Sequence, residues 1–174
     1  MSTVHPATAA GLESLADQFS ACADALHSRL MSALRQPLPQ DADGSPAPPP
    51  AGTLPAGGKE APPLSQGITR GAAQLLFDTE VTLRQRANSL YVEAAQLSVS
   101  GLALPQQDLL GLVAQARTRI ARIEQLKELA ATAASLVALA AAIVAARPQD
   151  LPAAFKELQG HLARQPATAA KTGA

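Results

Sequence analysis

The sequence predicts an all-α protein built on an antiparallel helical hairpin that resembles a coiled coil. A separate N-terminal amphipathic helix, a short C-terminal helix and a disordered Pro-rich linker complete the expected fold. Apolar residues recur at steps of three and four through several long stretches, which is the period of a helix. Only four aromatic residues are present and none is Trp, so the core must consist of aliphatic side chains, among which Leu and Ala are strong helix formers.

The stretch between Pro105 and Pro148 predicts one continuous helix, about 65 Å long at 1.5 Å per residue. From Leu129 to Ala146 it carries no charge, and a helix that is apolar on all sides must be buried. Its apolar steps are Leu109, Val113, Ala116, Ile120, Ile123, Leu126, Ala130, Ala133, Val137, Ala140 and Val144.

A second helix is expected from near Ile68 to about Ser100, because leucines recur there every seven residues. Small residues follow four positions after most of these leucines, so a partner helix can approach closely. Gly101 and Pro105 mark its end, and so short a connection favours antiparallel packing against the following helix.

The apolar rows of these two helices form the predicted interaction seam. A hairpin buries only one side of each helix, so we expect the remaining apolar surface to bind a protein partner or a second copy of the chain. The seam comprises Leu76, Leu83, Leu90, Leu97, Leu109, Val113, Ile120, Ile123, Leu136, Val137, Ile143 and Val144.

The N-terminal helix is expected from about Ala7 to Gln36, with Cys22 on its apolar stripe as a small buried side chain rather than a reactive thiol. Residues 37–66 are rich in Pro, Gly and Ala, which predicts a disordered linker. A short helix around Phe155 follows Pro148 and Pro152 and should fold back over the apolar end. The predicted domains are residues 1–36, 37–66, 67–164 and 165–174, the last a disordered tail.

The residues offer no catalytic, cofactor or metal chemistry that we can assign. His5, His27 and His161 are scattered rather than clustered as metal ligands, and no phosphate-binding or nucleophile motif is present. Arg117, Arg119 and Arg122 form the densest basic cluster, which we interpret as a solvated face beside Glu124 and Glu128. Equal numbers of basic and acidic residues, 14 of each, argue against nucleic acid as a partner.

These features predict a non-enzymatic helical interaction, scaffold or adaptor protein that acts by self-association or by docking partner helices. The alternative is association with a membrane or another apolar surface through residues 129–146, which are long enough to span a bilayer. More than half of these residues are Ala, so insertion is energetically marginal. Residues 1–10 show no secretory signal, so a cytoplasmic location is expected, with membrane association as the alternative. The Ala-, Pro- and Arg-rich composition suggests a bacterial source.

Overall fold

The computed structural model describes residues 7–37, 63–145, 147 and 149–164, and within the second helix it leaves out the side chains at 95 and 97–100. In this part of the chain every regular element is helical, which confirms the predicted all-α class. The elements are α1 (Ala9–Leu34), the 3₁₀ turn η1 (Leu64–Gln66), α2 (Arg70–Ser100), α3 (Gln106–Ile120), α4 (Leu126–Val144) and α5 (Leu151–Ala163).

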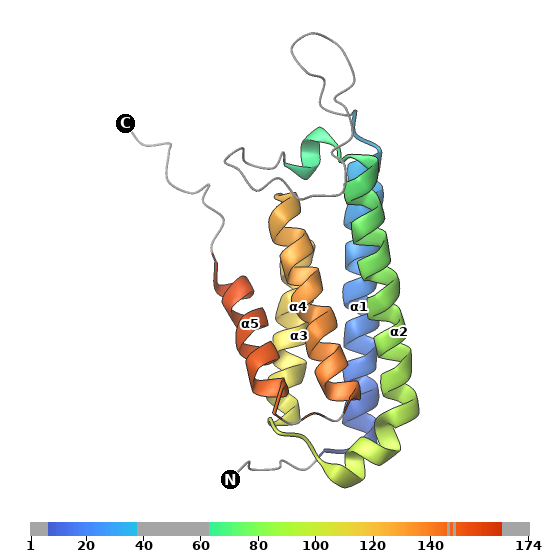
Figure 1. Ribbon diagram of the computed structural model, residues 1–174, viewed down its shortest axis with the longest axis vertical. Coiled ribbons are helices and arrows are strands. Elements are labelled where there is room, and N and C mark those ends of the chain that lie inside the picture. The colour runs from blue at the N-terminus through green and yellow to red at the C-terminus, as the bar shows by residue number, and fades with distance from the viewer. Residues whose placement is uncertain (1–6, 38–62, 146, 148, 165–174) are drawn as a thin grey trace, which may run out of the picture.

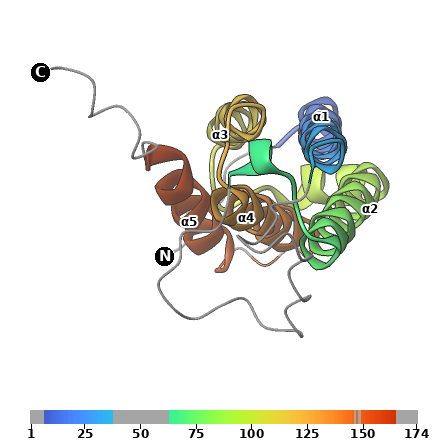
Figure 2. The same ribbon diagram turned by 90° about the horizontal axis from the view of Figure 1, so that it is seen from above.

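The helices alternate in direction and form a bundle (Figure 1). Seen from above, α1, α2, α4 and α3 occupy the corners of a four-helix arrangement, and α5 lies beside α3 and α4 on the side away from α1 and α2 (Figure 2). Neighbouring helices pack along the edges of this arrangement, whereas α2 and α3 face each other across a diagonal and hardly touch.

The predicted continuous helix between Pro105 and Pro148 is wrong, because the chain turns between Ala121 and Gln125 and divides it into α3 and α4. Contacts from other parts of the chain stabilise the turn. Arg29 donates a hydrogen bond from Nη2 to the carbonyl oxygen of Ile123, and the backbone N–H of Leu64 donates to the carbonyl of Glu124 at 2.7 Å. The Ile123 side chain stays buried within the turn, so the apolar period continues through it.

The partners of α2 also differ from the predicted hairpin, since α2 packs most extensively against α1 and then against α4. Two side-chain contacts fix the register of the antiparallel α1–α2 pair. Tyr91 donates a hydrogen bond to Asp17, and Arg84 donates to Asp24 at 2.7 Å. The two contact residues on α1 are seven positions apart, and so are the two on α2, which is the repeat of a coiled coil.

Helix α4 occupies the most buried position, as expected for a helix without charge beyond Glu128. It packs against α2 on one side and α5 on another, with further contacts to α3 and α1. Within α4, only Lys127, Ala134 and Ala138 are exposed. The predicted return of the C-terminal helix is confirmed, because Leu151 and Leu158 of α5 are buried against this core.

The ends of the helices carry the expected local signals. Thr8 caps α1, where its hydroxyl oxygen accepts a hydrogen bond from the backbone N–H of Gly11 at 3.1 Å. Gly101 follows α2 with a φ of 77°, a left-handed conformation that favours glycine. Asp108 lies in the first turn of α3, where its charge complements the helix dipole.

Most of the predicted linker, residues 38–62, lies outside the described residues, as does the predicted tail from 165 to 174. The last four residues of the predicted linker are described and belong to the fold. Leu64 of η1 is buried, and Pro63 forms an isolated bridge with Gln125. The structure therefore places the entry to α2 against the α3–α4 turn.

Replacement of Leu90 by Asp should unfold the bundle, because Leu90 is fully buried in α2. An unpaired carboxylate there should lower the free energy of unfolding by at least about 3 kcal/mol. The control is Asn88→Asp, which adds the same side chain at an exposed position two residues away and should change it by no more than about 0.5 kcal/mol. Urea denaturation followed by circular dichroism measures both, and equal losses would show that these helix faces are assigned wrongly.

Candidate interaction surface

The predicted interaction seam lies inside the bundle. Leu76, Leu83, Leu90, Leu109, Val113, Ile120, Ile123, Leu136 and Ile143 are buried, and Val137 and Val144 are half-buried against the same core. Leu97 belongs to α2, but its side chain lies outside the described residues. These residues pack α1, α2, α3, α4 and α5 together, so a docking surface must be sought elsewhere.

A buried carboxylate joins α1 and α2. Glu80 is 4% exposed, and both of its carboxylate oxygens have partners. Arg84 donates from Nε to Oε1 at 3.1 Å, and His27 lies with Nδ1 at 3.0 Å from Oε2. Because an ionised carboxylate only accepts hydrogen bonds, His27 must carry its hydrogen on Nδ1. Hydrogen bonds to Asp24 and then to Glu80 raise the pKa of Arg84 above its ordinary value, with burial opposing them.

Sequence reasoning did not assign Glu80 a role, although a signal was present. Glu80 occupies the row that continues as Ala87 and Ala94, four residues after each leucine of α2. A charged residue on an otherwise apolar row indicates either a break in the interface or a buried ion pair. The structure shows the second arrangement.

Substitution of Glu80 by Ala should lower the free energy of unfolding by about 1–3 kcal/mol, because it removes the acceptor of two hydrogen bonds and leaves a cavity where the buried Glu80 side chain packs. Asp24→Ala removes another partner of the same Arg84, but the Asp24 side chain is 67% exposed, so its loss should cost no more than about 1 kcal/mol. Urea denaturation of the two variants gives the comparison. A larger loss for Asp24→Ala would contradict a structural role for the buried carboxylate.

Cys22 lies on the buried face of α1, where sequence reasoning expected it. Its thiol is 3.5 Å from the carbonyl oxygen of Val113 in α3, to which it donates a weak hydrogen bond. Burial raises the pKa of Cys22 to about 12, and the nearby Arg117 guanidinium opposes this shift. The thiol is thus a packing group between α1 and α3.

The folded protein should resist alkylation of Cys22 by iodoacetamide. A rise of the pKa from 9.0 to about 12 lowers the thiolate fraction near neutral pH by about three orders of magnitude. Intact-mass measurement should find little modification in buffer and complete modification in concentrated urea. Rapid modification of the native protein would mean that the α1–α3 interface opens readily.

An open groove of about 790 Å³ runs between α1 and α3 on the surface. We call it the α1–α3 groove. Small side chains form much of its lining, and Arg29 and Arg117 stand in it as cations. Its lining residues are Gln18, Ala21, Asp24, Ala25, Ser28, Arg29, Ser32, Ala114, Arg117, Thr118 and Ala121.

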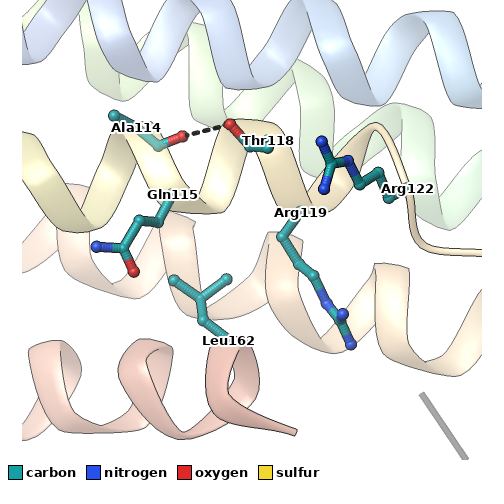
Figure 3. A pocket seen from close by; sticks show the side chains of 6 residues that line it. All are labelled: Ala114, Gln115, Thr118, Arg119, Arg122 and Leu162. Atoms are coloured by element: carbon teal, nitrogen blue, oxygen red, sulfur yellow. Dashed lines mark hydrogen bonds between the residues drawn. The ribbon is translucent and has the colours of Figure 1, made fainter. Parts of the chain in front are cut away.

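A second and smaller hollow of about 450 Å³ lies between α3 and α5 (Figure 3). Leu162 of α5 points toward α3, while Gln115 and Arg119 extend from α3 on the side of α5. Ala114 and Thr118 line this α3–α5 hollow and the α1–α3 groove alike. One helix, α3, therefore separates the two depressions.

The basic cluster Arg117, Arg119 and Arg122 spans the end of α3 and the turn that follows, and its members differ in exposure. Arg117 and Arg122 are exposed, as the predicted solvated face requires. Arg119 differs, because its side chain is 22% exposed and pairs with Glu128 at 3.6 Å. It also donates from Nη2 to the carbonyl oxygen of Arg164 at 2.6 Å, which ties α3 to the end of α5. Arg119 is thus a packing residue.

The described residues also bear on metal binding and on membrane association. Among the residues that the structure describes, no group of three or more His, Cys, Asp or Glu side chains is placed to hold a metal ion. In the same part of the chain, α4 is the one helix long and apolar enough to cross a membrane, by length and composition alone. A buried core helix satisfies the same criteria, and α4 contacts all four of the other α-helices.

No family model, curated protein or solved structure matches this chain.

Proposed function

We propose that this protein is a non-enzymatic helical interaction protein that docks a partner helix in the α1–α3 groove. The proposal rests mainly on the groove itself, an open depression of about 790 Å³ between the parallel helices α1 and α3. The predicted seam supplies the rigid core beneath it. Recognition of one helix by a groove between others is a common mode of protein binding.

The dimensions of the groove suit a helix. Its lining residues on α1 run from Gln18 to Ser32, a length of about 21 Å at 1.5 Å per residue, or nearly four turns. Ala21 and Ala25 on α1 and Ala114 on α3 present small side chains, which let another helix approach closely.

The bundle already contains a comparable arrangement. Helix α5 packs against α3 and α4 and buries Leu151 and Leu158 there. The α1–α3 groove lies on the other side of α3 and has no such cover in the part of the chain that the structure describes. A helix in this groove would continue the packing pattern that α5 begins.

The burial of α4 supports docking of a protein helix over association with a membrane. Residues 129–146 are the expected contact with an apolar phase, and most of the described side chains among them pack within the bundle. Their exposure to lipid would require α2 and α5 to move away.

A photoreactive amino acid placed at Ser28 should cross-link a bound partner, because Ser28 is exposed and lines the groove. The matched control places the same amino acid at Asn88, which is exposed on α2 and does not line the groove. Cross-linking is carried out in cells and the product is mapped by mass spectrometry.

The expected result is a cross-link from Ser28 to a helical segment of another protein or of a second copy, with no equivalent product from Asn88. Absence of a Ser28 product, or the same products from both positions, would count against docking in the groove.

A further inference from the structure

We infer that the α1–α3 groove selects an acidic amphipathic helix of a partner protein, with Arg117 as the principal contact. This inference rests on the proposed docking function and adds the chemical class of the partner. It is based on the excess of cations over anions among the lining residues, and on the hydrogen-bond partners of the two lining arginines.

The lining of the groove carries two cations and one anion. Arg29 comes from α1 and Arg117 from α3, whereas Asp24 is the one acidic lining residue. The carboxylate of Asp24 is already paired with Arg84 of α2 at 2.7 Å. Arg84 is shared with Glu80, so the positive charge of the lining comes from its excess of one cation, with two arginines against one aspartate.

Arg117 is available to a ligand. Its side chain is exposed, and no ion pair or side-chain hydrogen bond to it is found in the described part of the chain. It lies on α3 and lines the groove opposite α1. An exposed guanidinium in such a position suits bidentate pairing with a carboxylate.

Arg29 contributes charge from the opposite wall. Its Nη2 group donates to the carbonyl oxygen of Ile123, which anchors the side chain beside the α3–α4 turn. Its Nε group is buried and has no hydrogen-bond partner. Arg29 thus keeps a fixed cation at one end of the groove while Arg117 remains free to pair.

The surroundings lack the usual features of a phosphate site or a base-stacking site. Phosphate sites commonly use backbone N–H groups at a helix N-terminus, but Arg29, Ser32, Arg117 and Ala121 lie in or beside the C-terminal halves of α1 and α3. No aromatic side chain lines the groove for stacking on a base. The small lining residues suit the apolar face of a helix, and the two arginines suit acidic residues along its edge.

Binding of synthetic helical peptides to the full-length protein tests the inference. Three Ala/Leu-based peptides of about 18 residues, long enough for the groove, carry Glu, Gln or Lys at the same edge positions. Fluorescence anisotropy should show that the Glu peptide binds at least about tenfold more tightly than the Gln peptide, and that the Lys peptide binds most weakly.

Arg117→Gln should remove most of the preference for the Glu peptide over the Gln peptide. Arg86→Gln, which changes an exposed arginine of α2 outside the groove, should preserve it.

A variant that blocks the groove distinguishes helix docking itself from the preference for an acidic helix. Ser28→Trp fills the groove from an exposed position, with Asn88→Trp as its control, and should abolish binding of the Glu peptide. If the Glu and Gln peptides bind equally and Ser28→Trp blocks both, the groove docks helices but the acidic preference is wrong. If Ser28→Trp changes nothing, or no peptide binds, the docking proposal falls as well. Arg117-dependent binding of inorganic phosphate or of anionic vesicles, without binding of the peptides, would overturn the inference in favour of a phosphate ligand.

Discussion

The need to cover α4 governs the rest of the structure. Between Leu129 and Val144 this helix has no charged side chain, and each leucine left in water would cost about 1.5–3 kcal/mol. Helices α2 and α5 cover two of its sides, and α3 and α1 complete the enclosure. The turn after α3 is what makes this possible, because it carries α4 back into the space between the other helices. A continuous helix would have left that surface in water.

The helices could be predicted from the sequence because their apolar steps are regular. The observed bounds of α1, α2 and α5 follow the expected ranges closely. The turn between α3 and α4 could not be predicted in the same way, since residues 121–125 contain neither Gly nor Pro. Its buried Ile123 also keeps the apolar step of a helix through the turn. The contacts that stabilise it come from Arg29 and Leu64, which are distant in sequence.

The pairing of helices also depended on information that periodicity does not carry. A heptad row indicates that a helix packs against another helix, but it does not identify that helix. In this bundle, specific polar contacts pair α1 with α2: Tyr91 with Asp17, Arg84 with Asp24, and the buried Glu80 with His27. These pairs join α1 to α2 at one register. The candidate groove was missed for a related reason, because Ala21 and Ala25 are ordinary helix residues until α3 is placed beside them.

The position of α3 as a wall shared by two depressions has a thermodynamic consequence. Ala114 and Thr118 face both the α1–α3 groove and the α3–α5 hollow, and Arg119 ties this wall to the carbonyl of Arg164 at the end of α5. A ligand that wedges α1 and α3 apart would push α3 toward α5 and narrow the hollow. Ligands on the two sides would then weaken each other, and because linkage is reciprocal, each would lower the affinity of the other by the same factor. Antagonism of this kind would let a ligand bound in the α3–α5 hollow lower the affinity of the α1–α3 groove, although α5 does not line that groove.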